Sequence, residues 1–281
     1  MRYYFKQSNL PEEFSQDHFA DPAHYHQYKE LDPIRRDVFL KKLNHPRWGI
    51  FHAVLVFAIC FAALTCLGAW LGLAIAFVRG LINMGGLDAA AIENFLMLPL
   101  VYIQSIMLIL APFLVARYYY LGRAWHSLGI KRPRFKDIAK GAGAALAAYP
   151  AVMLINLLVS AVAGETEGQD IMMALLNSAE LWQTIGLVVG IVLIGPLSEE
   201  IFFRGFLFPA MNKRWSLFPS ALFSGFLFSL VHFSIVVIIS FTLLGMMLAY
   251  LYKKTGSLWA SVACHAVFNG ISVTLMLIYY A

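Results

Sequence analysis

Five ionisable side chains lie within long apolar stretches of the last third of the chain: Glu199, Glu200, Arg204, His232 and His265. If those stretches cross a membrane, each such group costs about 2.5 kcal/mol or more to insert, so it normally marks a functional site or an ion pair. Carboxylates and imidazoles are the side chains that most often move protons to and from a reacting group. We therefore predict a general acid–base centre built from these residues.

The spacing of the first three residues separates two roles. Glu200 and Arg204 are four positions apart with the acid first, which is the preferred order for an ion pair on one helix. Glu199 is rotated by about 100° around the same helix and has no such partner. This leaves Glu199 available as a general base toward water. The alternative is that both glutamates merely complete an internal polar network.

The two histidines each share a helix face with a second residue. Phe228 and His232 are four apart, and so are His265 and Asn269. At a rise of 1.5 Å per residue, these side chains and Glu199 are expected at depths of about 12–22 Å from the same membrane surface. Three helices would then bring Glu, His, His and Asn together, as a catalytic centre requires.

Pro196 lies just before the two glutamates and has no backbone N–H to donate. Its position leaves a helical carbonyl without a donor. We expect the helix to kink there and to admit water near Glu199.

The composition indicates a helical membrane protein rather than an ordinary soluble enzyme. Of 281 residues, 60% are hydrophobic and only 13% are charged, whereas soluble domains carry roughly 25% charged residues. Six stretches of 18 to 38 residues contain no Lys, Arg, Asp or Glu: 48–78, 94–116, 141–164, 181–198, 215–252 and 255–281. A membrane span needs about 20 apolar residues. The sequence therefore predicts an all-α, polytopic transmembrane bundle.

The longest uncharged stretch must contain a turn. As one helix, its 38 residues would extend about 57 Å, almost twice the hydrocarbon thickness of about 30 Å. We place the turn near Phe233 and Ser234. The prediction is then about seven spans: 49–78, 95–117, 139–163, 181–211, 216–233, 235–252 and 257–280.

The distribution of basic residues predicts the orientation. With a cytosolic N-terminus, 20 of the 21 Lys and Arg residues fall in cytosolic segments, as the positive-inside rule expects. Membrane orientation therefore explains the net charge of +5 better than nucleic-acid binding does. We expect an uncleaved multi-pass protein, in the plasma membrane if the source is bacterial, with the lipid bilayer as its surroundings.

Three regions follow from this pattern. Residues 1–47 contain eight basic and seven acidic side chains and are expected to form a cytosolic extension. Residues 48–138 would contain two spans and a basic cytosolic loop. Residues 139–281 would form the catalytic core.

Three short motifs in the predicted core resemble those of a known family. EEIFFR at 199–204 matches EExxxR, FSLVH at 228–232 matches FxxxH, and HAVFN at 265–269 matches HxxxN. In this order, each on a predicted span, they resemble the signature of the CPBP intramembrane proteases. That family includes type II CaaX prenyl endopeptidases and bacteriocin-processing or immunity proteins. The resemblance covers residues 139–281.

The resemblance implies a glutamate-dependent intramembrane endopeptidase acting on a peptide or a lipidated protein. Glu199 and His232 would hold and activate the attacking water. His265 and Asn269 would stabilise the oxyanion.

The same resemblance implies three supporting residues: Glu200, Arg204 and Phe228. No cofactor is required in the favoured mechanism. Zinc is the alternative, with Glu199, His232 and His265 as its three ligands and an open position for water. The sequence lacks the HExxH motif typical of many zinc peptidases.

An alternative function of a different class stays open. A non-catalytic membrane scaffold, or an immunity partner, could use the same bundle and the same polar core for packing alone, because function belongs to the site and not to the fold.

Overall fold

The computed structural model describes residues 46–82, 89–120, 124–163, 174–176, 180–234 and 236–280. Nearly all of the predicted N-terminal extension therefore lies outside the described residues. The chain divides into two units, 1–47 and 48–281, and the second unit contains the helices discussed below.

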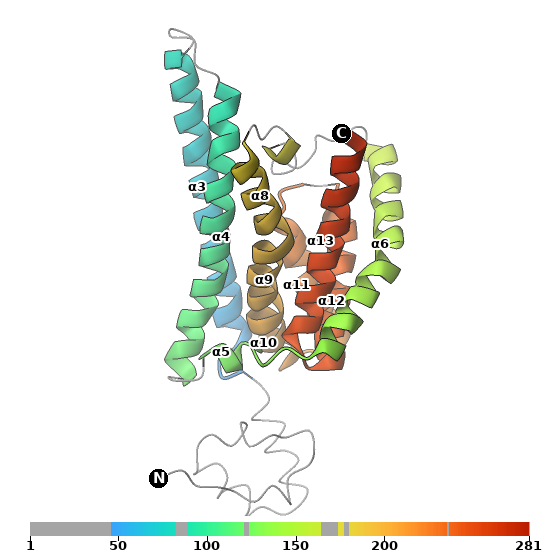
Figure 1. The fold of residues 1–281 in the computed structure, drawn as a ribbon. Coiled ribbons are helices and arrows are strands. Elements are labelled where there is room, and N and C mark those ends of the chain that lie inside the picture. The colour runs from blue at the N-terminus through green and yellow to red at the C-terminus, as the bar shows by residue number, and fades with distance from the viewer. Residues whose placement is uncertain are drawn as a thin grey trace, which may run out of the picture. The chain divides into compact units, whose positions relative to one another are not determined.

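Seven helical rods follow one another in the described residues, and they lie where the spans are predicted (Figure 1). The rods are α3 (Ile50–Ile82), α4 (Ala89–Tyr120), α6 (Phe135–Ala163), a composite rod from Leu181 to Asn212, α11 (Leu217–Leu230), α12 (Ile238–Thr255) and α13 (Leu258–Tyr280). A short helix, α5 (Ala124–Ser127), precedes α6. The expected all-helical bundle is confirmed.

Five of these rods are long and apolar enough to cross a membrane: α3, α4, α6, the composite rod and α13. The protein is accordingly a multi-pass integral membrane protein. The helix α11 has only 14 residues, a length of about 21 Å, which is shorter than the hydrocarbon layer. Seven complete spans and a cytosolic N-terminus therefore stay predictions.

The composite rod is interrupted next to Pro196, where the sequence predicts a kink, and at a second place that the sequence does not predict. It consists of α8 (Leu181–Val189), the π-helical turn η3 (Gly190–Ile194), α9 (Gly195–Glu200), a second π-helical turn η4 (Ile201–Leu207) and α10 (Phe208–Asn212). Pro196 is the second residue of α9, directly after the first π turn. Turns of π-helix within α-helices are rare and frequently accompany functional sites.

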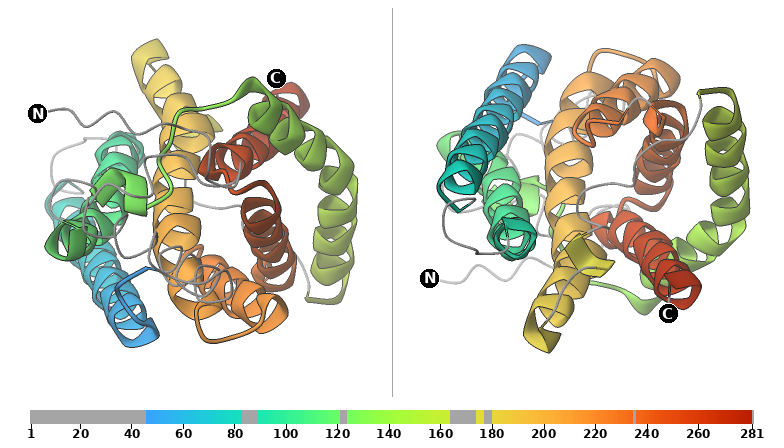
Figure 2. Two further views of the ribbon diagram at one scale, coloured as in Figure 1. Left: turned by 90° about the horizontal axis from the view of Figure 1, so that it is seen from below. Right: turned by 90° about the horizontal axis from the view of Figure 1, so that it is seen from above.

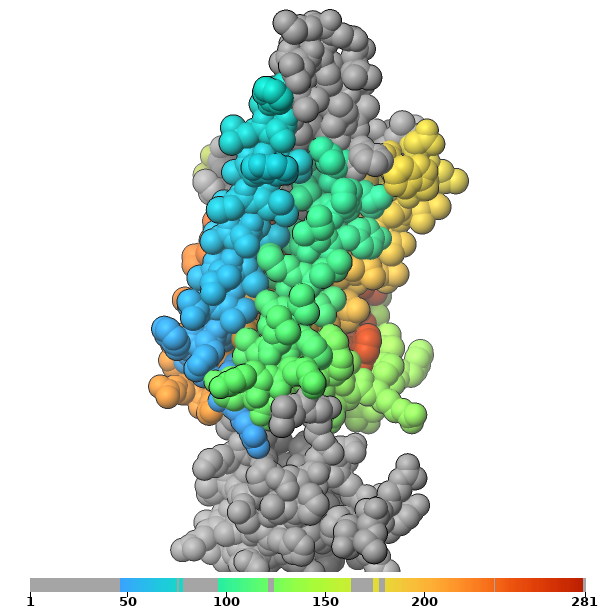
Figure 3. Space-filling view, turned by 90° about the vertical axis from the view of Figure 1, so that its left-hand side faces the viewer, coloured from blue at the N-terminus to red at the C-terminus, as the bar shows by residue number. Residues whose placement is uncertain are grey.

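The composite rod runs between two groups of helices. Figure 2 shows α3 and α4 on one side of it and α11, α12, α13 and α6 on the other. The helices α3 and α4 pack side by side, as the space-filling view in Figure 3 also shows. On the opposite side, α6 packs against α13, and α11 packs against α12. The rod therefore contacts helices of both groups.

Glycines bring two pairs of helices into unusually close contact. A Cβ atom on Gly141 of α6 would overlap the carbonyl oxygen of Ala260 in α13. A Cβ on Gly225 of α11 would lie 2.5 Å from the carbonyl oxygen of Thr242 in α12. Membrane helices use small residues in this way to let their backbones approach.

The turn between α11 and α12 lies where the sequence placed it. The helix α11 ends at Leu230, and Phe233 has a φ of 51°, in the left-handed region that a bulky residue seldom adopts. The Phe233 ring stacks on Phe61 of α3, with their centroids 5.2 Å apart. His232 therefore lies in the turn beyond the end of α11 and not within the span, which corrects the expected helical position.

Candidate functional site

The predicted ion pair between Glu200 and Arg204 is present at the centre of the site. Arg204 Nη1 donates a hydrogen bond to Glu200 Oε1 at 2.9 Å, and both side chains are completely buried. Arg204 Nη2 donates to the carbonyl oxygen of Gly245 at 3.0 Å. The guanidinium carbon also lies 4.7 Å from the centroid of the Phe228 ring. One side chain thus connects the composite rod with both α11 and α12.

The contact between Gly225 and Gly245 explains how Arg204 reaches the backbone of α12. A Cβ on Gly245 would lie 2.6 Å from Gly225 Cα and 3.3 Å from Arg204 Nη2. Only a residue without a side chain lets the two helices and the guanidinium meet at this point. Neither glycine was predicted from the sequence to belong to the site, although small residues in apolar helices are a recognised signal of close approach.

His265 lies between the two neighbouring glutamates. Its Nδ1 is 3.1 Å from Glu200 Oε1, and its Nε2 is 3.8 Å from Glu199 Oε2. Because a carboxylate oxygen is an acceptor, Nδ1 is the donor in the contact with Glu200. The sequence predicted that His265 and Glu199 would meet across helices, and this is confirmed. The bond between His265 and Glu200 was not predicted.

Glu199 differs from Glu200 in its partners and in its exposure. Its side chain is 14% exposed, whereas that of Glu200 is fully buried. Among the residues that the structure describes, Glu199 Oε2 and Glu200 Oε2 are both buried and have no hydrogen-bond partner. A buried carboxylate oxygen is costly unless it meets a polar group. Glu199 therefore occupies the part of the cluster that best fits a polar ligand.

His232 approaches the cluster from the turn after α11. Its Nδ1 donates to the carbonyl oxygen of Phe228 at 3.0 Å. Its ring packs edge to face against Phe228 at 5.1 Å and against Phe241 of α12 at 4.6 Å. Since Nδ1 carries the hydrogen in that bond, Nε2 is the acceptor nitrogen of the neutral ring. The His265 ring lies 5.5 Å from the same Phe228 ring, so Phe228 contacts both imidazoles.

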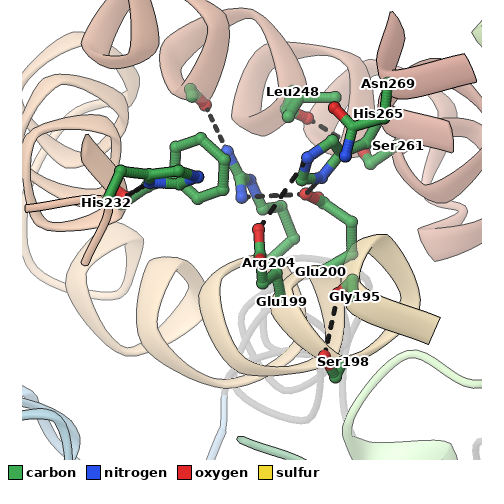
Figure 4. A network of polar contacts seen from close by, with 12 residues as sticks. Gly195, Ser198, Glu199, Glu200, Arg204, His232, Leu248, Ser261, His265 and Asn269 are labelled. Carbon is green, nitrogen blue, oxygen red and sulfur yellow. Dashed lines mark hydrogen bonds and ion pairs between the residues drawn. The ribbon is translucent and has the colours of Figure 1, made fainter. Parts of the chain in front are cut away.

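Asn269 contacts the composite rod through its amide. Its Nδ2 donates to the carbonyl oxygen of Ile191 at 2.9 Å, and Ile191 belongs to the first π turn. Figure 4 shows Asn269 and His265 on the same helix to one side of Arg204, with His232 on the other side. The structure therefore brings Glu199, Glu200, Arg204 and His265 into one cluster. His232 lies on the Phe228 flank of that cluster.

The arrangement of side chains does not form a preassembled metal site. In the part of the chain that the structure describes, no three His, Cys, Asp or Glu side chains are grouped so that they could hold a metal ion. His265 Nδ1 is bonded to Glu200, and His232 Nδ1 to a backbone carbonyl, so Nε2 is the nitrogen that each imidazole could offer to a metal ion. Zinc-bound histidines commonly make bonds of this kind through their other nitrogen, so these bonds do not argue against zinc. Binding of zinc by Glu199, His232 and His265 therefore stays a prediction, and we derive no step through a metal ion.

Comparisons with known proteins agree with the motif pattern. Residues 180–271 match the family model for type II CAAX prenyl endopeptidase Rce1-like proteins. A protein of Bacillus subtilis (strain 168) named "Putative membrane peptidase YdiL" is 25% identical over 123 residues, which cover 44% of this chain and 48% of that protein. The match thus spans about half the length of this relative. No solved structure matches the chain.

The matched segment begins at the composite rod and ends within α13, so it contains every residue of the cluster. The resemblance to the CPBP intramembrane proteases is confirmed for this segment.

Proposed function

We propose that the protein is an intramembrane endopeptidase of the CPBP type, which hydrolyses peptide bonds with a glutamate-activated water. One observation carries this proposal. His265 lies between two adjacent carboxylates, and Glu199 keeps some exposure, unlike Glu200, and makes no hydrogen bond through Oε2 to the residues that the structure describes. The segment that matches a prenyl endopeptidase family contains this cluster.

The reaction assigns a separate task to each side chain. The water oxygen attacks the carbonyl carbon of the scissile bond, and its proton passes to Glu199, with His232 holding the water through its free Nε2. The C–N bond then breaks, and the proton held by Glu199 passes to the leaving amine. Acid and base are thus the same carboxyl group at different stages.

His265 and Asn269 would stabilise the negative charge that develops on the carbonyl oxygen. With Nδ1 donating to Glu200, the His265 ring can donate to an oxyanion only from Nε2, so it must carry both hydrogens. The Glu200 carboxylate offsets the charge of that ring, and Arg204 in turn balances Glu200. Glu200 and Arg204 are therefore supporting residues that hold His265.

The substrate class follows from the surroundings of the cluster. The site is buried among membrane helices, and the family model that matches is that of prenyl endopeptidases. We propose a peptide or a lipidated protein that reaches the site from the membrane or its boundary.

Glu199→Gln is the variant that tests the enzyme proposal, because it keeps the size of the side chain but removes the base. Peptide cleavage should fall at least about 100-fold, the usual contribution of a general base. Glu180→Gln is the matched control, since Glu180 precedes α8 and is far along the rod from the cluster. The measurement is cleavage of a substrate peptide by purified, folded protein. Undiminished cleavage by Glu199→Gln would refute the proposal.

The same variant separates the enzyme from the scaffold. Arg204 connects its own rod with two other helices, by a hydrogen bond to α12 and a ring contact with α11, which favours a packing role for part of the polar core. A scaffold would keep its cellular phenotype in Glu199→Gln, whereas a peptidase would lose it. Metal analysis of active protein, together with sensitivity to chelators, distinguishes the metal-free mechanism from a zinc mechanism.

A further inference from the structure

The carbonyl group of Ile191 has lost both of the donors that a helix could supply. In an α-helix, it would accept from the N–H of Gly195, four residues later. In the π turn, that N–H instead bonds to the carbonyl oxygen of Gly190. The next residue is Pro196, which has no N–H. The π turn and the proline together therefore leave this carbonyl without a donor from either position.

Asn269 supplies the missing donor from another helix. Its Nδ2 lies 2.9 Å from Ile191 O, and Ile191 is only 8% exposed. Buried carbonyl groups in folded proteins are almost always paired. The bond between Asn269 and Ile191 thus helps to stabilise the π turn.

The π turn determines which face of the rod meets α13. Before the turn, α8 is held by α4, because the Tyr102 hydroxyl donates to Gly186 O at 3.1 Å and a Cβ on Gly190 would lie 2.9 Å from the Val101 side chain. The additional residue in a π turn rotates everything after it by about 100° relative to an unbroken α-helix. Glu199 and Glu200 follow directly in α9.

We propose that Asn269 is a positioning residue for the two glutamates: it holds the π turn at Ile191 and so sets the rotation of α9 against His265. His265 lies one helical turn before Asn269, so a single helix carries the imidazole and also fixes the carboxylates that this imidazole meets. The proposal rests on the proposed function for its catalytic consequence but not for the structural coupling itself. The amide has a second N–H, so an oxyanion contact remains compatible.

A double-mutant cycle of Asn269→Ala and Pro196→Ala tests the proposal. Alanine at 196 restores a backbone N–H next to the unpaired carbonyl, or lets the turn relax to an α-helix in which Gly195 serves Ile191. In both cases, Ile191 no longer depends on Asn269. If Asn269 acted only on the oxyanion, the two substitutions would be independent.

The first readout is the thermal unfolding midpoint in detergent, which needs no activity. Asn269→Ala should lower the midpoint by about 2–6 °C in the wild-type background, from the cost of an unpaired buried carbonyl. In the Pro196→Ala background, the same substitution should lower it by less than half as much. Equal shifts in the two backgrounds would overturn the proposal. This result stands even if no peptidase activity is found, so it is distinguishable from failure of the proposed function.

The second readout is the dependence of the turnover rate on pH. If Asn269 positions Glu199 and Glu200, Asn269→Ala should move the acid limb of the profile, and Pro196→Ala should return it toward that of wild type. Loss of an oxyanion donor alone would lower the rate at every pH and leave the limb in place. A limb that does not move in Asn269→Ala counts against positioning.

Two further variants keep the test decisive. Asn269→Asp retains the shape of the side chain but has no N–H, so it should reproduce the effects of alanine if that variant folds poorly. Ser272→Ala is the matched control on α13, because its hydroxyl bonds to Tyr149 and not to the rod. Its effect should be the same with and without Pro196→Ala. Coupling between Ser272→Ala and Pro196→Ala as large as that of Asn269→Ala would overturn the assignment to Asn269.

Discussion

The composite rod packs against two very different surfaces. Toward α3, it presents aromatic rings: Phe202 lies 6.3 Å from Phe57, and Phe206 lies 5.2 Å from Trp48. Toward α11, α12 and α13, the same rod presents Glu200 and the guanidinium of Arg204, each bonded to a partner at 2.9–3.1 Å. Both surfaces are buried. The first contains one directional bond, from Trp48 Nε1 to the carbonyl oxygen of Phe206, whereas the second contains charged groups that depend on each other.

The two surfaces should differ in how well they tolerate substitutions. An aromatic contact depends mainly on volume and is maintained by many rings of similar size. A buried ion pair depends on both partners, because the loss of one leaves a charge without compensation. We therefore expect the α3 side of the rod to tolerate substitution and the α13 side to resist it.

The largest effect should follow from Arg204→Met. The substitution leaves the fully buried Glu200 carboxylate without its cation, so the free energy of unfolding should fall by about 3–5 kcal/mol. The measurement is the fraction of folded protein against denaturant in detergent. The double variant Glu200→Gln with Arg204→Met removes both charges and should recover much of the loss. If the double variant is no more stable than the single one, the pair is not the reason for the sensitivity.

A smaller loss is expected for Gly245→Ala. The added Cβ would lie 2.6 Å from Gly225 Cα, so α11 and α12 must separate and the bond from Arg204 to Gly245 O must lengthen. Overpacking of this kind costs about 1–3 kcal/mol. Thermal unfolding in detergent measures it. Gly143→Ala is the control, because a Cβ there would meet no atom within 4 Å. Similar losses in both variants would contradict the role given to this helix crossing.

Phe202→Leu should have the smallest effect, and it tests the aromatic surface of the composite rod. Phe202 is fully buried against aromatic rings and makes no polar contact with the cluster. A hydrophobic replacement of similar size should cost less than about 1.5 kcal/mol. Cleavage of a substrate peptide should continue at the wild-type rate. A strong loss of cleavage with folding intact would mean that the apolar side also sets the geometry of the site.

Features that depend on neighbours along the chain were predictable. The positions of the helical rods follow from the lengths of the uncharged stretches, since apolar length is what a membrane requires. The pair between Glu200 and Arg204 follows from a separation of four residues on one helix. The turn at Phe233 follows from a stretch too long for one span.

Features that depend on rotation of one helix against another were not predictable. Two such features are contacts between distant segments: the bond of His265 to Glu200 and the approach of Gly245 to Arg204. A third is the position of His232 beyond the end of α11. The sequence predicted a kink at Pro196 but not the two π turns, because a π turn is recognised only from the hydrogen bonds of the folded helix.

The order of residues was enough to predict the membrane class, the approximate extent of the helices, the local ion pair and a set of residues able to do chemistry. The packed helices were needed to show which imidazole lies between the two glutamates. They also show that, among the described residues, one oxygen of each glutamate makes no hydrogen bond. The physical reason is that spacing along a helix specifies a face of that helix. The direction in which the face points depends on π turns and glycine contacts that exist only once the helices are packed.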